Sequence, residues 1–137
     1  MGILLCATGN GAQSRNVQNA AVEAARRQQK HLVFLHVVDL RQMGELDESL
    51  QPAARAELAW LGEATLRLAQ DRAQRQGVQT DSVILYGDVR EALEGYLRTH
   101  PVDLLLLGAV TNDEITRFAR RVQEEMGVAV EFVAAKA

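Results

Sequence analysis

The chain has 137 residues, of which 47% are hydrophobic and 24% are charged. This length suits one domain over residues 1–137, and the composition excludes a disordered or fibrous chain. The net charge of −3 and the aromatic content of 4% argue against a nucleic-acid-binding domain, which needs a basic surface or aromatic side chains for base stacking.

Short apolar runs alternate with helical periodicity along the chain, which is typical of βαβ units. Residues 3–8 predict a first strand that leads into a glycine-rich turn. Ser14 is the predicted N-cap of a first helix, and residues 31–38 predict a strand buried on both faces. A long helix is predicted between Pro52 and Gly77. One stripe of this helix is expected to face the core, namely Leu58, Leu61, Thr65, Leu68 and Arg72.

The second half of the chain continues the same alternation. Residues 78–86 predict a third strand, and Asp88 and Glu91 form a capping box that opens a third helix. Residues 102–107 form the most apolar run, so we expect them to be a central strand.

A fourth helix and a fifth strand complete the pattern. Thr111 and Glu114 form a second capping box, and Gly127 is the expected stop of the helix that follows. Residues 128–133 predict the last strand. The expected fold is therefore an α/β domain with an open, parallel five-stranded sheet and helices on both faces.

The sequence predicts neither a membrane-spanning helix nor a signal peptide. Its longest apolar run, around residues 104–107, is far shorter than the roughly 20 residues needed to cross a bilayer. Cys6 is the single cysteine, so an internal disulfide is excluded and a reducing compartment is favoured. We therefore expect a cytoplasmic protein that does not bind a membrane.

Ligands of open parallel α/β sheets bind beyond the carboxyl ends of the strands, where the strand order reverses. The turn after the first strand could hold a phosphate at the start of a helix, but a plain structural turn is the preferred interpretation. It matches neither the dinucleotide-binding fingerprint nor a Walker loop. The candidate residues for a nucleotide-like pocket are Thr8, Gly9, Asn10, Val38, Asp39, Gly108, Asn112 and Thr116.

No catalytic constellation or metal-binding motif is visible in the sequence, so we do not expect an enzyme. Cys6 is interpreted as a buried structural thiol, and His36 as a packed or backbone-bonded side chain. Asp39 would suit a ribose or an amine, but a solvated loop carboxylate is the preferred interpretation. Trp60 and Tyr96 are expected to pack in the core or in an interface rather than to stack on a ligand.

Segments in several parts of the chain resemble the universal stress protein family. These segments are Ile3-Leu4-Leu5 before a glycine turn, Leu35-His36-Val37-Val38, Gly87-Asp88, and Val102-Asp103-Leu104-Leu105-Leu106-Leu107-Gly108. The resemblance extends over the whole chain. It implies an adenine-nucleotide-binding-like fold with strand order 3-2-1-4-5, and dimers that pair through the last strand.

The chain departs from the nucleotide-binding members of this family where they hold ATP. Those members carry an Asp at the end of the first strand, where this chain has Thr8. They also carry G-x2-G-x9-G-[S/T] after the fourth strand. Here Gly108 supplies only the first glycine, Thr111 stands at the second, and Thr116-Arg117 replaces the final pair. The segment that follows Gly108 is also shorter than in those members.

Negative charge at the start of the fourth helix also argues against ATP binding. Asp113 and Glu114 lie in its expected first turn, where they offset the helix dipole and would repel a phosphate. We therefore expect a divergent member of the family that does not bind ATP in the usual way and needs no cofactor.

Three functions are compatible with the sequence. The leading hypothesis is a regulatory or stress-response domain that acts by dimerisation and by binding a small ligand or a protein partner whose identity the sequence does not specify. The alternatives are a version that binds ATP or AMP and hydrolyses it weakly, and an unrelated small α/β enzyme. The absence of a G-x-S-x-G elbow from the sequence argues against the enzyme.

The homodimer is expected to form through the edge of the last strand. Its interface residues would be Val128, Val130, Phe132 and Val133.

Overall fold

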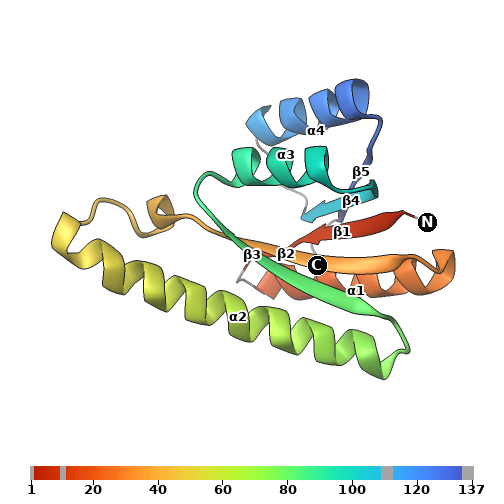
Figure 1. The fold of residues 1–137 in the computed structure, drawn as a ribbon, viewed down its shortest axis with the longest axis horizontal. Coiled ribbons are helices and arrows are strands. Elements are labelled where there is room, and N and C mark those ends of the chain that lie inside the picture. Colours follow the sequence, from red (N-terminus) through yellow and green to blue (C-terminus); the bar gives the residue numbers. More distant parts are fainter. Residues whose placement is uncertain (1, 10–11, 109–112, 134–137) are drawn as a thin grey trace.

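The computed structural model describes residues 2–9, 12–108 and 113–133 (Figure 1). In these ranges five strands alternate with four α-helices, and two short 3-10 helices precede the second α-helix. In chain order the elements are β1 (Ile3–Ala7), α1 (Ala12–Gln28), β2 (His31–Val38), η1 (Leu40–Met43), η2 (Glu48–Leu50), α2 (Gln51–Arg75), β3 (Thr80–Tyr86), α3 (Val89–Thr99), β4 (Val102–Gly108), α4 (Asp113–Met126) and β5 (Ala129–Val133).

The strands form one parallel sheet in the order β3-β2-β1-β4-β5, which confirms the expected architecture and strand order. The middle strand is β1, where Cys6 is in register with Phe34 of β2 and with Leu106 of β4. The apolar strand β4 is interior, as expected, but it lies beside the middle strand rather than forming it.

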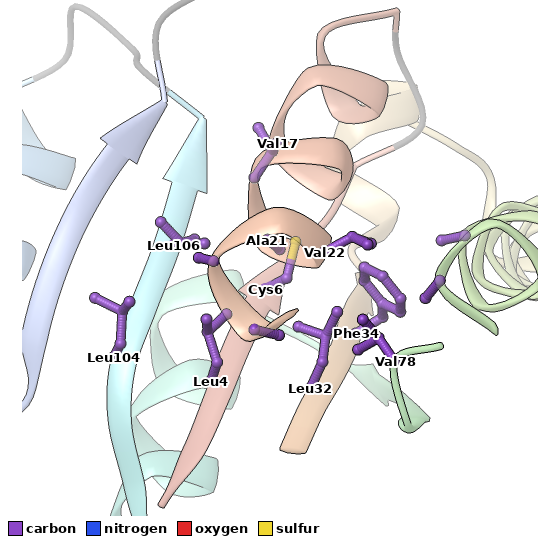
Figure 2. Packing of buried hydrophobic residues seen from close by; sticks show 14 of the residues in the cluster. Leu4, Cys6, Val17, Ala21, Val22, Leu32, Phe34, Val78, Leu104 and Leu106 are labelled. Atoms are coloured by element: carbon purple, nitrogen blue, oxygen red, sulfur yellow. The ribbon is translucent and has the colours of Figure 1, made fainter. Parts of the chain in front are cut away.

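Helices cover both faces of this sheet, with α1 and α2 on one side and α3 and α4 on the other (Figure 1). Figure 2 shows Leu4 and Cys6 of β1 packed on the α1 side. The intervening Leu5 faces α3 and α4. Because successive side chains of a strand point to opposite faces, a strand covered on both faces is apolar along most of its length, and this explains the long apolar runs of the interior strands.

Two of the predicted N-caps, Ser14 and Asp88, are among the described residues. Asp88 is the N-cap of α3, since its Oδ1 accepts a hydrogen bond of 3.1 Å from the Glu91 N–H, and the prediction is confirmed. The prediction for Ser14 is wrong, because α1 begins at Ala12 and Ser14 lies inside its first turn. A capping residue type marks a helix start only to within one or two positions. Thr111 of the second predicted capping box lies outside the described residues.

The inner face of α2 differs from the predicted stripe. Its buried positions are Ala54, Leu58, Gly62, Leu66, Ala69 and Ala73. Leu61 and Leu68, which were expected to face inward, are 44% and 59% exposed, and Trp60 is 69% exposed. The prediction failed because α2 carries apolar residues on two faces. Leu58 and Leu66 face the sheet together with Gly62 and three alanines, whereas the large side chains of Trp60, Leu61 and Leu68 face outward. Among the described residues, no helix combines the length and the hydrophobicity required to cross a lipid bilayer.

Candidate functional site

The carboxyl ends of β2, β1 and β4 lie next to one another at one edge of the sheet. The strand order reverses at β1, because α1 and α3 cross over on opposite faces, and this is where α/β sheets bind ligands. Thr8, Val38 and Gly108 lie at these three strand ends, so the structure brings the predicted positions to one edge. Asn10 and Asn112 of the predicted site lie outside the described residues.

Thr8 directly follows β1 and is buried, with only 6% of its surface exposed. Its N–H donates to the carbonyl of Leu35 at 2.9 Å, and its carbonyl lies 2.8 Å from Nδ1 of His36. Its hydroxyl donates to the carbonyl of Gly9 at 3.1 Å and accepts a hydrogen bond of 2.6 Å from the Gln18 amide. The Thr8 side chain is therefore bonded within the protein instead of being presented to a ligand.

A polar connection runs from Thr8 through Gln18 on α1 to Arg72 on α2. Gln18 is 2% exposed, and its Oε1 accepts a hydrogen bond from Nη2 of Arg72. Within the described part of the chain, Nε of Arg72 is buried without a hydrogen-bond partner. Burial, and to a lesser extent the nearby charge of Arg15, lower the pKa of Arg72. This connection was not predicted from the sequence, where its only signal is a glutamine at an inward position of α1.

A second polar cluster joins the start of η1 to the start of α3. Arg41 bridges two carboxylates, with Nη2 at 2.7 Å from Asp39 and at 2.6 Å from Asp88. The side-chain hydrogen bonds from Arg41 hold the pKa of Asp39 below its usual range. The pKa of Asp88 is lowered mainly by the hydrogen bond from the backbone N–H of Glu91 and to a lesser extent by Arg41. Both carboxylates are thus stabilised in their charged form by partners within the chain.

The interpretation of Asp39 as a solvated loop carboxylate is wrong. Its side chain is only 10% exposed, and Oδ1 caps η1 by accepting a hydrogen bond of 3.0 Å from the N–H of Arg41. An open hollow of about 580 Å³ lies beside this cluster, between η1 and the start of α2. Its charged lining comprises Arg41, Glu45 and Asp47, so negative charge predominates. This lining favours a cation or a neutral polar group over a phosphate.

The two candidate reactive side chains at this edge have structural roles. Cys6 is fully buried, and burial raises the pKa of its thiol. His36 is 2% exposed and bonded to the Thr8 carbonyl, so both interpretations made from the sequence are confirmed. No group of three or more His, Cys, Asp or Glu side chains that could hold a metal ion occurs in the ranges that the structure describes.

The first turn of α4 is acidic. Asp113 and Glu114 are both exposed there, and Glu114 lies 3.6 Å from the Arg90 guanidinium of α3. Thr116 is exposed one turn into α4, so it is part of the helix rather than of a phosphate-binding loop. Gly108 ends β4, opposite Val133 of β5. The first turn of α4 thus carries two carboxylates, one of which is paired with Arg90.

The last strand, β5, lies at the edge of the sheet as predicted. Phe132 is 41% exposed, whereas Val130 and Val133 are half-buried. Val128 precedes the strand and is buried in the core formed with α3 and α4, so its side chain is already packed within its own chain. A partner strand would therefore meet Val130, Phe132 and Val133.

The chain is similar to known proteins both in sequence and in fold. A model of the universal stress protein family matches residues 1–124. No curated protein sequence matches the chain. The universal stress protein UspA from Lactobacillus plantarum is a similar solved structure, with 21% identity, coverage of 98% of this chain and 97% of the other, and a TM-score of 0.76.

Two further structures are similar over nearly their whole length. A protein of the universal stress protein family from Burkholderia pseudomallei has 26% identity, coverage of 99% of this chain and 96% of the other, and a TM-score of 0.72. A universal stress protein family protein from Arabidopsis thaliana, with AMP bound, has 14% identity, coverage of 100% and 94%, and a TM-score of 0.70.

Proposed function

The chain belongs to the universal stress protein family, and we propose that it is a non-enzymatic regulatory domain of the stress response that does not hold ATP in the usual way. It would act by dimerisation and by binding a small ligand or a protein partner. The observation that carries this proposal is that the side chains at the carboxyl edge are bonded to one another. Thr8 is bonded to Gln18, and Asp39 and Asp88 are bonded to Arg41.

Electrostatics at α4 support the proposal. The start of a helix attracts anions because its N–H groups are unpaired and its dipole is positive there. The carboxylates of Asp113 and Glu114 offset this field in the first turn of α4. A triphosphate would have to displace or overcome these charges before it reached the helix.

Isothermal titration of the full chain with ATP and magnesium tests the proposal. We expect no saturable binding in the micromolar range. Replacing both acids (Asp113→Asn with Glu114→Gln) should increase any residual affinity for ATP. The matched control, Glu124→Gln with Glu125→Gln, makes the same charge change in the last turns of α4 and should have no effect. Micromolar binding of ATP by the unmodified chain would overturn the proposal.

Binding of a nucleoside monophosphate is the second candidate function. The supporting observation is the relative from Arabidopsis thaliana that has AMP bound and whose fold this chain shares. AMP carries less negative charge than ATP and would therefore be repelled less by the acidic start of α4. Saturable binding of AMP in the same titration, with none for ATP, would favour this candidate.

Dimerisation is proposed to occur through β5. An edge strand presents unpaired backbone groups that can pair with a second copy, and the exposed Phe132 lies on this edge. Sedimentation velocity should show a dimer that Phe132→Glu disrupts and Phe132→Leu retains. A monomeric mass for the unmodified chain at all concentrations would contradict this part of the proposal.

A further inference from the structure

The outer face of α2 carries an exposed apolar stripe made by Trp60, Leu61, Ala64 and Leu68, here called the outer stripe. The three large side chains are 69%, 44% and 59% exposed, and Ala64 is half-buried. They are separate from the inner residues of α2, which pack on β2 and β3. Contiguous exposed apolar residues on one helix face are typical of an interaction surface rather than of a solvated one.

The spacing of the outer stripe matches that of a helix-to-helix contact. Trp60, Ala64 and Leu68 follow one another at intervals of one helical turn, and Leu61 and Leu68 are one heptad apart. Residues with this spacing form a narrow seam along α2. A second helix is the partner that such a seam fits.

Two of the charges that flank the seam, those of Glu57 and Arg75, are self-complementary. Glu57 precedes the outer stripe and Arg75 follows it, about five full turns apart, so both project on the same side of α2 as the stripe. If two copies of α2 pack antiparallel about a two-fold axis near residue 66, Glu57 of each copy meets Arg75 of the other. In the same arrangement Ala64 faces Leu68, a small residue against a large one. A parallel pair would instead place Glu57 against Glu57.

We propose that the outer stripe is an interface with a second copy of this chain, formed by antiparallel pairing of α2. Such a symmetric contact uses the same patch on both subunits. In the single chain Arg75 is bonded to Asp71 at 2.9 Å, but both side chains are more than half exposed. A guanidinium carries five N–H donors, so Arg75 can keep its contact with Asp71 and still pair with Glu57 of the second copy.

This interface does not overlap with the one proposed for β5. α2 packs on β2 and β3, which lie on one side of β1, whereas β5 is the opposite edge of the sheet. The two contacts can therefore coexist, and together they would build an assembly larger than a dimer. A single pair of helices buries less than the roughly 800 Å² per partner of a typical stable interface, so we expect association that depends on concentration.

Trp60 is the only tryptophan of the chain, so its fluorescence reports on this interface alone. We expect the emission of a solvent-exposed indole at low concentration. As the concentration rises from nanomolar to hundreds of micromolar, the emission should shift to the blue and become protected from iodide quenching. The same change should occur in the Phe132→Glu variant, which removes the β5 contact. An unchanged spectrum over this range in both proteins would overturn the proposal.

Charge exchange tests the pairing itself. Glu57→Arg and Arg75→Glu should each weaken the concentration-dependent association at least tenfold, because each places like charges across the interface twice. Mixing the two single variants should restore association as a heterodimer, and a chain that carries both changes should associate with itself again. Failure of the mixture to associate would overturn the antiparallel arrangement.

The matched control is Glu63→Arg, which makes the same charge change at an exposed position on another side of α2. It should leave association unchanged, and an effect equal to that of Glu57→Arg would overturn the proposed alignment. Circular dichroism of every variant reports whether the fold is retained. Loss of the β5 contact alone leaves the Trp60 signal intact, so the proposed β5 interface and the proposed α2 interface can be disproved separately.

Discussion

Gly62 of α2 lies directly against the imidazole ring of His36 on β2. A Cβ atom at position 62 would come within 2.4 Å of Cδ2 of His36 and within 2.9 Å of Nε2. The ring cannot easily give way, because His36 is buried and its Nδ1 is bonded to the carbonyl of Thr8 at 2.8 Å. This contact determines which side of α2 faces the sheet and therefore which apolar residues remain outside.

Gly62→Ala should destabilise the protein even though alanine is the better helix former. The added methyl group must displace the His36 ring or α2, and overpacking of this kind costs about 1–3 kcal/mol. Chemical denaturation measures the change. The matched control is Gly95→Ala in α3, where nothing lies within 4 Å of the new Cβ, and stability should rise by roughly 0.5–1 kcal/mol. Equal effects of the two substitutions would contradict the proposed role of Gly62.

The bridge of Arg41 to Asp39 and Asp88 should make stability depend on pH. Both carboxyl groups have lowered pKa values in the folded chain, because they accept hydrogen bonds from Arg41 and from the N–H of Glu91. Their stabilising contribution is therefore complete above the unfolded pKa of about 3.9 and is lost as the pH falls through the lower folded values.

Denaturation at pH 7 and at acid pH measures this loss of stability. Asp39→Asn should lower stability at pH 7 and reduce the fall on acidification. Asp71→Asn removes an exposed pair with Arg75 and serves as the control. A fall with acid that is the same in Asp39→Asn and in the unmodified chain would rule out the role assigned to Asp39.

Thr8→Val should destabilise the protein although the two side chains have nearly the same shape. The substitution removes the hydroxyl that accepts the hydrogen bond from the buried Gln18 amide at 2.6 Å. An unsatisfied buried donor costs about 1–3 kcal/mol. Thr8→Ser keeps the hydroxyl and should lose less stability in the same denaturation experiment. The opposite order of the two variants would show that packing of the methyl group matters more than the hydrogen bond.

Cys6 should be unreactive in the folded protein. Because the side chain is fully buried, a reagent cannot reach the thiol. Because burial raises the thiol pKa, the reactive thiolate form is not populated. A thiol reagent added at pH 8 should label the native chain at the rate of unfolding, whereas the chain in denaturant should react at once. Fast labelling of the native chain would contradict the structural role of this residue.

The strands and α-helices and their order could be predicted from the sequence alone, whereas the two 3-10 helices were not predicted. The interior strands are apolar at most positions because both of their faces are covered, and local residues such as Asp88 mark helix starts by bonding to the next turn. The positions of Thr8, Val38 and Gly108 at one edge followed from the same pattern, since parallel strands end together. These features depend on contacts between residues that are close in the sequence, or on the hydrophobic periodicity of a strand or a helix.

Other features were decided only by tertiary structure. Arg41 joins Asp39 to Asp88, and Gln18 joins Thr8 to Arg72, through contacts between elements far apart in the chain. The rotation of α2 is a further example, because its sequence offers two apolar faces. Hydrophobicity alone favours the face with the larger side chains. The close approach to His36 instead requires glycine at position 62, so packing against the sheet selected the face that carries Gly62 and left Trp60 exposed.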